Sequence, residues 1–165
     1  MNLRFLSAVA VALMLAACST KPVEQEAAVA PPPPPPPPPP AAPSGPLPSS
    51  IEYFNTVVGN SVNFDFDKYD LRADAQAVLR AQAAWLNQNP SRTLTVEGHC
   101  DERGTREYNL GLGDRRANAA KQYLMTLGVA ESRLKTISYG KERPLCVESS
   151  DSCWAKNRRG TSVAQ

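Results

Sequence analysis

The sequence predicts a single α/β domain in which helices pack on one face of a small mixed sheet, with a βαβαβ core. Segments with the two-residue period of strands alternate with segments that have the 3.6-residue period of helices. The stretch 51–165 holds about 115 residues, enough for one hydrophobic core and too few for two. Prolines crowd the region before it, since only Pro90 and Pro144 lie later in the chain.

The first seventeen residues have the pattern of a cleaved signal peptide. Arg4 supplies a positive charge, and residues 5–15 are almost wholly apolar. Leu15-Ala16-Ala17-Cys18 then resembles the bacterial lipobox, which implies cleavage before Cys18 and acylation of that residue with fatty acids such as palmitate. Ser19 in place of Asp favours the outer membrane. The alternative is an ordinary secretory signal that contains a cysteine.

Residues 18–50 are predicted to be a disordered tether rich in proline and alanine. They contain ten consecutive prolines, Pro31 to Pro40, which lack amide donors and cannot join a helix or a sheet. A polyproline II run of this length spans roughly 30 Å at about 3.1 Å per residue. We interpret the segment as a spacer; the alternative is a ligand for a proline-recognition domain.

The first half of the domain contains two predicted strands around a helix. Val62 to Phe66 alternates apolar and polar residues, as does the segment 93–99. Apolar residues recur at helical spacing from about 71 to 87, with Asp70 as the expected N-cap and Asn89-Pro90 as the stop.

The second half repeats the alternation. A helix is expected over 109–127, ended by Gly128, and a strand over 134–139. Gly111 and Gly113 inside that helix are interpreted as tolerance for close packing. A short helix is expected over 151–157, followed by a last strand.

Charge and hydropathy exclude several classes of protein. The chain has 18 Lys and Arg against 16 Asp and Glu, so we predict no nucleic-acid partner, which would require clustered basic residues. No apolar run reaches the roughly 20 residues of a membrane-spanning helix. No glycine-rich phosphate loop follows the first strand, and no cofactor is expected.

The cysteines are predicted to have different roles. Cys146 and Cys153 lie seven residues apart, and in an oxidising compartment we expect a disulfide between them. Cys100 is expected to be a small buried apolar residue. The neighbouring His99 and Asp101 suggest a metal site or a nucleophile, but consecutive strand residues point to opposite faces, so we predict neither.

Five segments together resemble the OmpA-like C-terminal domain family, and within it most closely the peptidoglycan-associated lipoproteins (Pal). They are Val62–Asp70, Val96–Thr105, Tyr108–Asn118, Ser138–Pro144 and Lys156–Arg159. Each is weak alone, but all five occur in the family's order and spacing. The family usually ends with a β-branched or aromatic strand, whereas this chain ends Gly-Thr-Ser-Val-Ala-Gln, so the last strand is expected to be short or frayed.

The resemblance implies a pocket for the zwitterionic end of diaminopimelate in peptidoglycan stem peptides. Asp101 would accept from the ammonium, and Arg116 would form a bidentate fork with the carboxylate. Residue chemistry alone favours a different interpretation, with Asp101 as a turn cap and Arg116 as a solvated helix charge, and it is the resemblance that reverses this preference. The resemblance adds six lining residues: Asn109, Leu110, Phe66, Asp67, Tyr69 and Asp70. The remaining candidates are interpreted structurally: Arg103, Arg106 and Arg115 as surface charges, and Tyr108 as a packing residue.

The function that the resemblance implies is a non-enzymatic anchor. The lipid would sit in the outer membrane while the domain, facing the periplasm, binds peptidoglycan. Membership of the Tol–Pal system, with TolB and other Tol components as partners and a role in cell division and envelope integrity, follows from the same resemblance. The alternatives are a wall-binding lipoprotein with no Tol role and a wall hydrolase.

Overall fold

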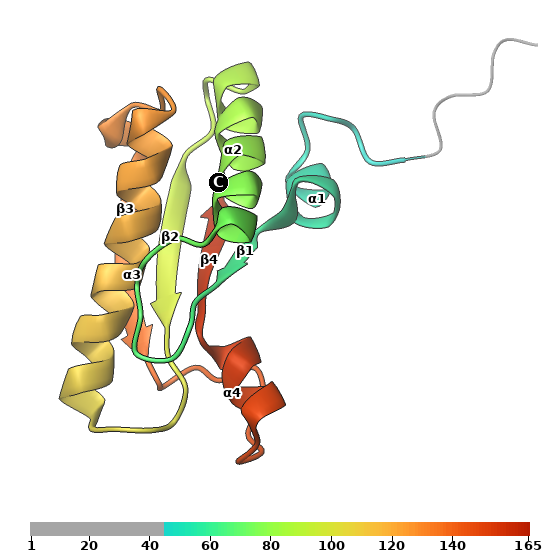
Figure 1. Cartoon of the computed structure of the whole chain (residues 1–165). Helices are drawn as coiled ribbons and strands as arrows, with labels where there is room; N and C mark the ends of the chain where they lie inside the picture. The colour runs from blue at the N-terminus through green and yellow to red at the C-terminus, as the bar shows by residue number, and fades with distance from the viewer. Residues whose placement is uncertain (1–44) are drawn as a thin grey trace, which may run out of the picture. The chain divides into compact units, whose positions relative to one another are not determined.

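A computed structural model describes residues 45–165 (Figure 1), so the predicted signal peptide, Cys18 and most of the predicted tether lie outside the described residues. The elements, in chain order, are α1 (Ile51–Tyr53), the π-helix η1 (Phe54–Gly59), β1 (Ser61–Asn63), α2 (Ala73–Gln88), β2 (Leu94–His99), α3 (Arg106–Thr126), the 3-10 helix η2 (Glu131–Arg133), β3 (Leu134–Gly140), α4 (Asp151–Asn157) and β4 (Arg159–Ala164). Over 45–165, no helix combines the length and the apolar character that crossing a bilayer requires.

The four strands form one mixed sheet in the order β1-β4-β2-β3. β2 and β3 are parallel, and β4 runs antiparallel to both β1 and β2. The helices α2 and α3 lie on the same face of this sheet (Figure 1). The predicted α/β sandwich with a βαβαβ core is confirmed.

The expectation of a short or frayed last strand is wrong. β4 is six residues long and occupies the centre of the sheet, paired with β1 on one side and β2 on the other. Hydrogen bonds to both neighbours outweigh the weak strand preference of its small residues. Buried Ser162 also donates from Oγ to Gln82 Oε1 at 2.8 Å, which ties β4 to α2.

The loop between β1 and α2 departs from the sequence expectation at both ends. β1 stops at Asn63, and Asp67 adopts a positive φ of 57°, a conformation that Asp tolerates better than most residues. α2 begins at Ala73 rather than near residue 71, and Asp70 does not cap it. Arg72 holds the N-cap position instead, and its guanidinium contacts Asp74 and the loop carboxylate of Asp65.

α3 begins three residues earlier than its apolar period indicates. Thr105 is its N-cap, and Thr105 Oγ1 accepts a hydrogen bond from Tyr108 N at 3.2 Å. This cap satisfies one of the free amides of the first turn. Because the helix starts at Arg106, its first two turns border the loop that follows β2.

The backbone of α3 approaches β2 and β3 so closely that glycine is required at Gly98 on the sheet and at Gly113 on the helix. A Cβ on Gly98 would lie 1.8 Å from Gly113 O, and a Cβ on Gly113 would lie 2.3 Å from Ser138 Oγ. The close-packing interpretation is therefore confirmed for Gly113. It is wrong for Gly111, where an added Cβ would meet only the flexible Arg115 guanidinium, at 3.6 Å.

Gly98→Ala is expected to destabilise the domain by about 1–3 kcal/mol or more, because a methyl group there overlaps a helix carbonyl that cannot move alone. Urea unfolding measures the change in the free energy of unfolding. Gly111→Ala is the matched control: it adds the same methyl group on an open helix surface and should be neutral or stabilise by up to about 1 kcal/mol. Equal stability of the two variants would contradict the close approach.

Candidate functional site

A pocket of about 170 Å³ opens where the loops after β1 and β2 meet the start of α3 and the residue that follows α4. It is lined by charged, aromatic and small residues, namely Phe66, Asp67, Cys100, Asp101, Arg103, Gly104, Tyr108, Asn109, Leu112, Arg116 and Arg158. Backbone segments far apart in the sequence therefore contribute to one site.

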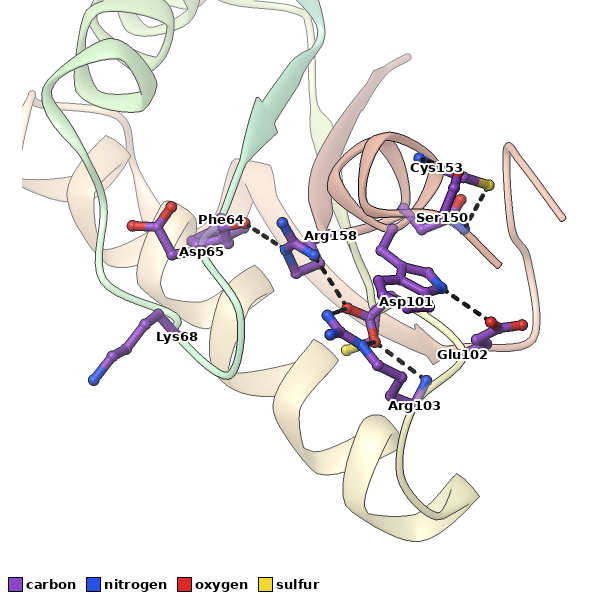
Figure 2. Close-up of polar contacts among 12 residues, drawn as sticks. Phe64, Asp65, Lys68, Asp101, Glu102, Arg103, Ser150, Cys153 and Arg158 are labelled. Carbon is purple, nitrogen blue, oxygen red and sulfur yellow. Dashed lines mark hydrogen bonds and ion pairs between the residues drawn. The ribbon is translucent and has the colours of Figure 1, made fainter. Parts of the chain in front are cut away.

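Asp101 is the buried anion of this pocket, with 4% of its surface exposed. Its carboxylate accepts from Arg103 Nη2 at 2.5 Å and from Arg158 Nη1 at 3.2 Å, and Figure 2 shows it between these two side chains. Burial alone would raise the pKa of Asp101, but the hydrogen bonds and charges of the two arginines outweigh it and lower the pKa. The carboxylate is therefore ionised and doubly paired.

Arg103 is not the free surface charge that the sequence suggested. Its guanidinium lies between two aromatic rings, 4.0 Å from the centroid of Phe66 and 4.2 Å from that of Trp154. Such stacking orients the guanidinium while leaving its N–H donors free for Asp101. The backbone N–H of Arg103 also donates to Asp101 Oδ1 at 3.2 Å.

Arg116 is fully buried at the inner end of the pocket and is held by backbone carbonyls. Its Nε donates to Lys68 O at 2.8 Å, Nη1 to His99 O at 2.8 Å and Nη2 to Asp65 O at 3.0 Å. Nη1 also contacts the sulfur of Cys100 at 3.4 Å. The predicted bidentate fork is therefore not open here, because Nη2 has one hydrogen bonded to Asp65 O and only its second hydrogen lacks an acceptor within the described part of the chain.

Aromatic side chains form the outer rim. Phe66 and Tyr108 are about half exposed, and the Tyr108 hydroxyl donates to Asp67 Oδ1. Tyr108 thus borders the pocket rather than packing in the core, contrary to its predicted role. Asn109 supports the loop from behind, because its Nδ2 donates to Arg103 O at 2.7 Å and to Thr105 O at 3.1 Å.

The structure brings five of the eight predicted ligand-binding residues to the pocket: Asp101, Arg116, Asn109, Phe66 and Asp67. Leu110 faces a separate depression beside Ser138 and Tyr139. Tyr69 and Asp70 do not line the pocket.

Sequence reasoning missed Arg103, Tyr108 and Arg158 as pocket residues. The Asn-Arg-Arg motif at the end of α4 could have indicated Arg158 as a pocket residue, since this motif formed part of the family resemblance.

The cysteines take different positions. Cys146 and Cys153 form a disulfide with a Cα–Cα distance of 5.3 Å. Cys100 is a buried free thiol in the pocket wall, and its Sγ donates to Asn109 O at 3.3 Å. Burial raises the pKa of this thiol, so it is a weak nucleophile. Among residues 45–165, no cluster of three His, Cys, Asp or Glu side chains is placed to hold a metal ion.

His99 lies outside the pocket, packed against Tyr139 with ring centroids 5.5 Å apart. Both of its ring nitrogens are buried and find no hydrogen-bond partner among residues 45–165, and Nε2 lies 3.6 Å from Glu97 Oε2. Burial and the nearby charges of Arg159 and Arg143 lower the pKa of His99 to about 4. The imidazole is therefore neutral in the folded domain at neutral pH.

Acidification from pH 7 to 4.5 should destabilise the wild type more than His99→Phe. The folded pKa of about 4 lies below the unfolded value of about 6.5, so the unfolded chain binds the extra proton between these pH values. The difference should reach about 2–3 kcal/mol near pH 4.5, measured by urea unfolding across the range. Parallel pH profiles for both proteins would show that His99 is not buried in neutral form.

Comparison with known proteins agrees with this architecture. The model of the OmpA family matches residues 63–158. The peptidoglycan-associated lipoproteins of Mesorhizobium japonicum and Agrobacterium fabrum are 55% and 53% identical to this chain over 116 residues, which is 70% of this chain and 69% and 66% of theirs.

Solved structures show the same relationship. The crystal structure of the peptidoglycan-associated lipoprotein from Burkholderia pseudomallei has a TM-score of 0.63 and 42% identity, and covers 64% of this chain and 90% of that one. The C-terminal domain of Helicobacter pylori MotB, at 19% identity and a TM-score of 0.60, over 64% of this chain and 84% of that one, shares the fold alone. The chain therefore belongs to the OmpA family, in the group of the peptidoglycan-associated lipoproteins.

Proposed function

We propose that this protein is a non-catalytic anchor that holds the outer membrane to peptidoglycan. The lipid would be attached to Cys18, and the domain 51–165 would reach the wall across the tether of residues 18–50. The family assignment supports the association with peptidoglycan and the lipidated N-terminus. The ligand would be the diaminopimelate end of the stem peptide, which carries an ammonium and a carboxylate.

The paired charges around Asp101 carry this proposal. A pocket that contains a buried carboxylate between two guanidinium groups offers opposite charges within one hydrogen-bond length of each other. A zwitterion can enter such a pair with its ammonium on Asp101 and its carboxylate on the arginines. This exchange leaves no buried charge unpaired, which is the condition for a favourable buried ion contact.

Arg116 would contribute to ligand binding with one hydrogen bond, and not with the bidentate fork that the family resemblance implies. Its second Nη2 hydrogen can donate one bond to a ligand carboxylate, and its buried positive charge favours an anion in the pocket. The aromatic rim of Phe66 and Tyr108 would cover the aliphatic stem of the ligand.

Asp101→Asn should weaken co-sedimentation with purified sacculi by at least about 30-fold, because removing one member of a buried charged contact costs roughly 2–5 kcal/mol. The experiment uses residues 19–165, without lipid, in a titration of sacculi. Asparagine keeps the shape of the side chain, and circular dichroism checks that the variant is folded.

Asp114→Asn is the control, because Asp114 is an exposed carboxylate on α3 that does not line the pocket. It should bind sacculi like the wild type. Wild-type binding with no loss in Asp101→Asn would place the wall contact elsewhere on the domain. Failure of the wild type to bind would overturn the anchor.

We further propose that this protein belongs to the Tol–Pal system, with TolB as partner and a role in envelope constriction at cell division. The observation that favours it is the identity of 51–55% to several peptidoglycan-associated lipoproteins. Affinity purification of this protein from its own envelope, after crosslinking, should recover TolB. Recovery of peptidoglycan fragments without TolB would favour the alternative, a wall-binding lipoprotein with no Tol role.

A further inference from the structure

The short helix α4 is held in place by the loop that the Cys146–Cys153 disulfide closes. It has seven residues, and helices of this length are not stable alone in water. Cys153, buried in α4, is joined by the disulfide to the partly exposed Cys146. Asn157 adds a second attachment at the other end, since its Nδ2 donates to Cys146 O at 2.7 Å and its Oδ1 accepts from Leu145 N at 2.8 Å.

This closed loop and the adjoining Trp154 contact the two residues that follow Asp101. Trp154 Nε1 donates to Glu102 Oε1 at 2.9 Å, and Ser149 Oγ donates to the same oxygen at 2.6 Å. The ring of Trp154 also stacks on the Arg103 guanidinium that pairs with Asp101. Figure 2 shows Cys153, Glu102, Arg103 and Asp101 in this one neighbourhood.

We propose that Trp154 is a positioning residue for the ligand pocket and that the Cys146–Cys153 disulfide locks it in place, so that reduction of the disulfide weakens ligand binding. The inference rests on the proposed function of the pocket. Trp154 touches no ligand in this scheme; it acts by holding the guanidinium of Arg103 at the position where the ligand carboxylate binds.

The reaction that would release the lock is thiol–disulfide exchange with a dithiol reductant. A thiolate of the reductant attacks the sulfur of Cys146, the less buried of the two cysteines, and Cys153 leaves as a thiolate and takes up a proton. The second thiol of the reductant then attacks the mixed disulfide and frees Cys146. The protein gains two thiols, and the reductant becomes a disulfide. Because Asn157 still holds Cys146, we expect the loosening to stay local.

The first experiment compares the oxidised and reduced protein, residues 19–165, in the sacculus titration. Reduction by dithiothreitol, with the extent measured by thiol counting, should weaken binding about five- to tenfold, the effect of losing one oriented cation–π contact. The double variant Cys146→Ala/Cys153→Ala should bind like the reduced protein and ignore dithiothreitol. It retains Cys100, which controls for effects of the free thiol.

The second experiment tests whether Trp154 transmits the effect. Trp154→Ala should bind sacculi like the reduced protein, and reduction should weaken it no further, because both changes release the same guanidinium. Trp154→Phe keeps the aromatic face and should recover most of the binding. A residue with only a structural role would lower the melting temperature without making the variant insensitive to reduction.

Equal binding of the oxidised and reduced wild type would overturn the inference. Absence of binding by the oxidised wild type would overturn the proposed function. Hydrogen exchange would then decide whether the disulfide still holds Trp154 against Arg103. Exchange of the Trp154 indole N–H and of the Arg103 backbone N–H should accelerate on reduction. Unchanged exchange at both would overturn the lock independently of any ligand.

Discussion

The buried guanidinium of Arg116 is the contact on which the site and much of the fold depend. No carboxylate of the described range 45–165 is bound to it, and the carbonyl dipoles of Asp65, Lys68 and His99 stabilise its charge. Without it, the buried carbonyl of His99 and the partly buried carbonyls of Lys68 and Asp65 would lose this donor, and each would have to find water or a new partner. One side chain of α3 therefore fixes both the loop after β1 and the end of β2, which form opposite walls of the pocket.

The charges of the pocket are arranged as an alternating series rather than as isolated groups. Arg158 bridges Phe64 O and Asp101, Asp101 pairs with Arg103, and Arg103 lies between two aromatic rings (Figure 2). Asp101 is therefore already paired with two arginines when the pocket is empty. Binding then becomes an exchange of partners, which favours ligands that carry both signs of charge.

Most of the fold could be predicted from the sequence because the periodic patterns of α2, β2, α3 and β3 are local. Where the prediction failed, the cause was long-range. β4 consists of residues with weak strand preference, and its place is set by pairing on both edges. The position of Arg103 could not be predicted either, because the rings that enclose it come from the loop after β1 and from α4. Asp101 and Arg116 were found only through the family's motifs, since their side-chain chemistry alone also fits a turn cap and a surface charge.

The central position of β4 has a consequence for the order of folding. Within residues 45–165, β1 pairs only with β4, the last strand of this range, so β1 has no partner there until β4 is present. Such long-range pairing delays the completion of the sheet and lowers the folding rate. A chain whose last residues are still inside the ribosome therefore cannot close its sheet, and β1 stays an unpaired edge until synthesis is complete.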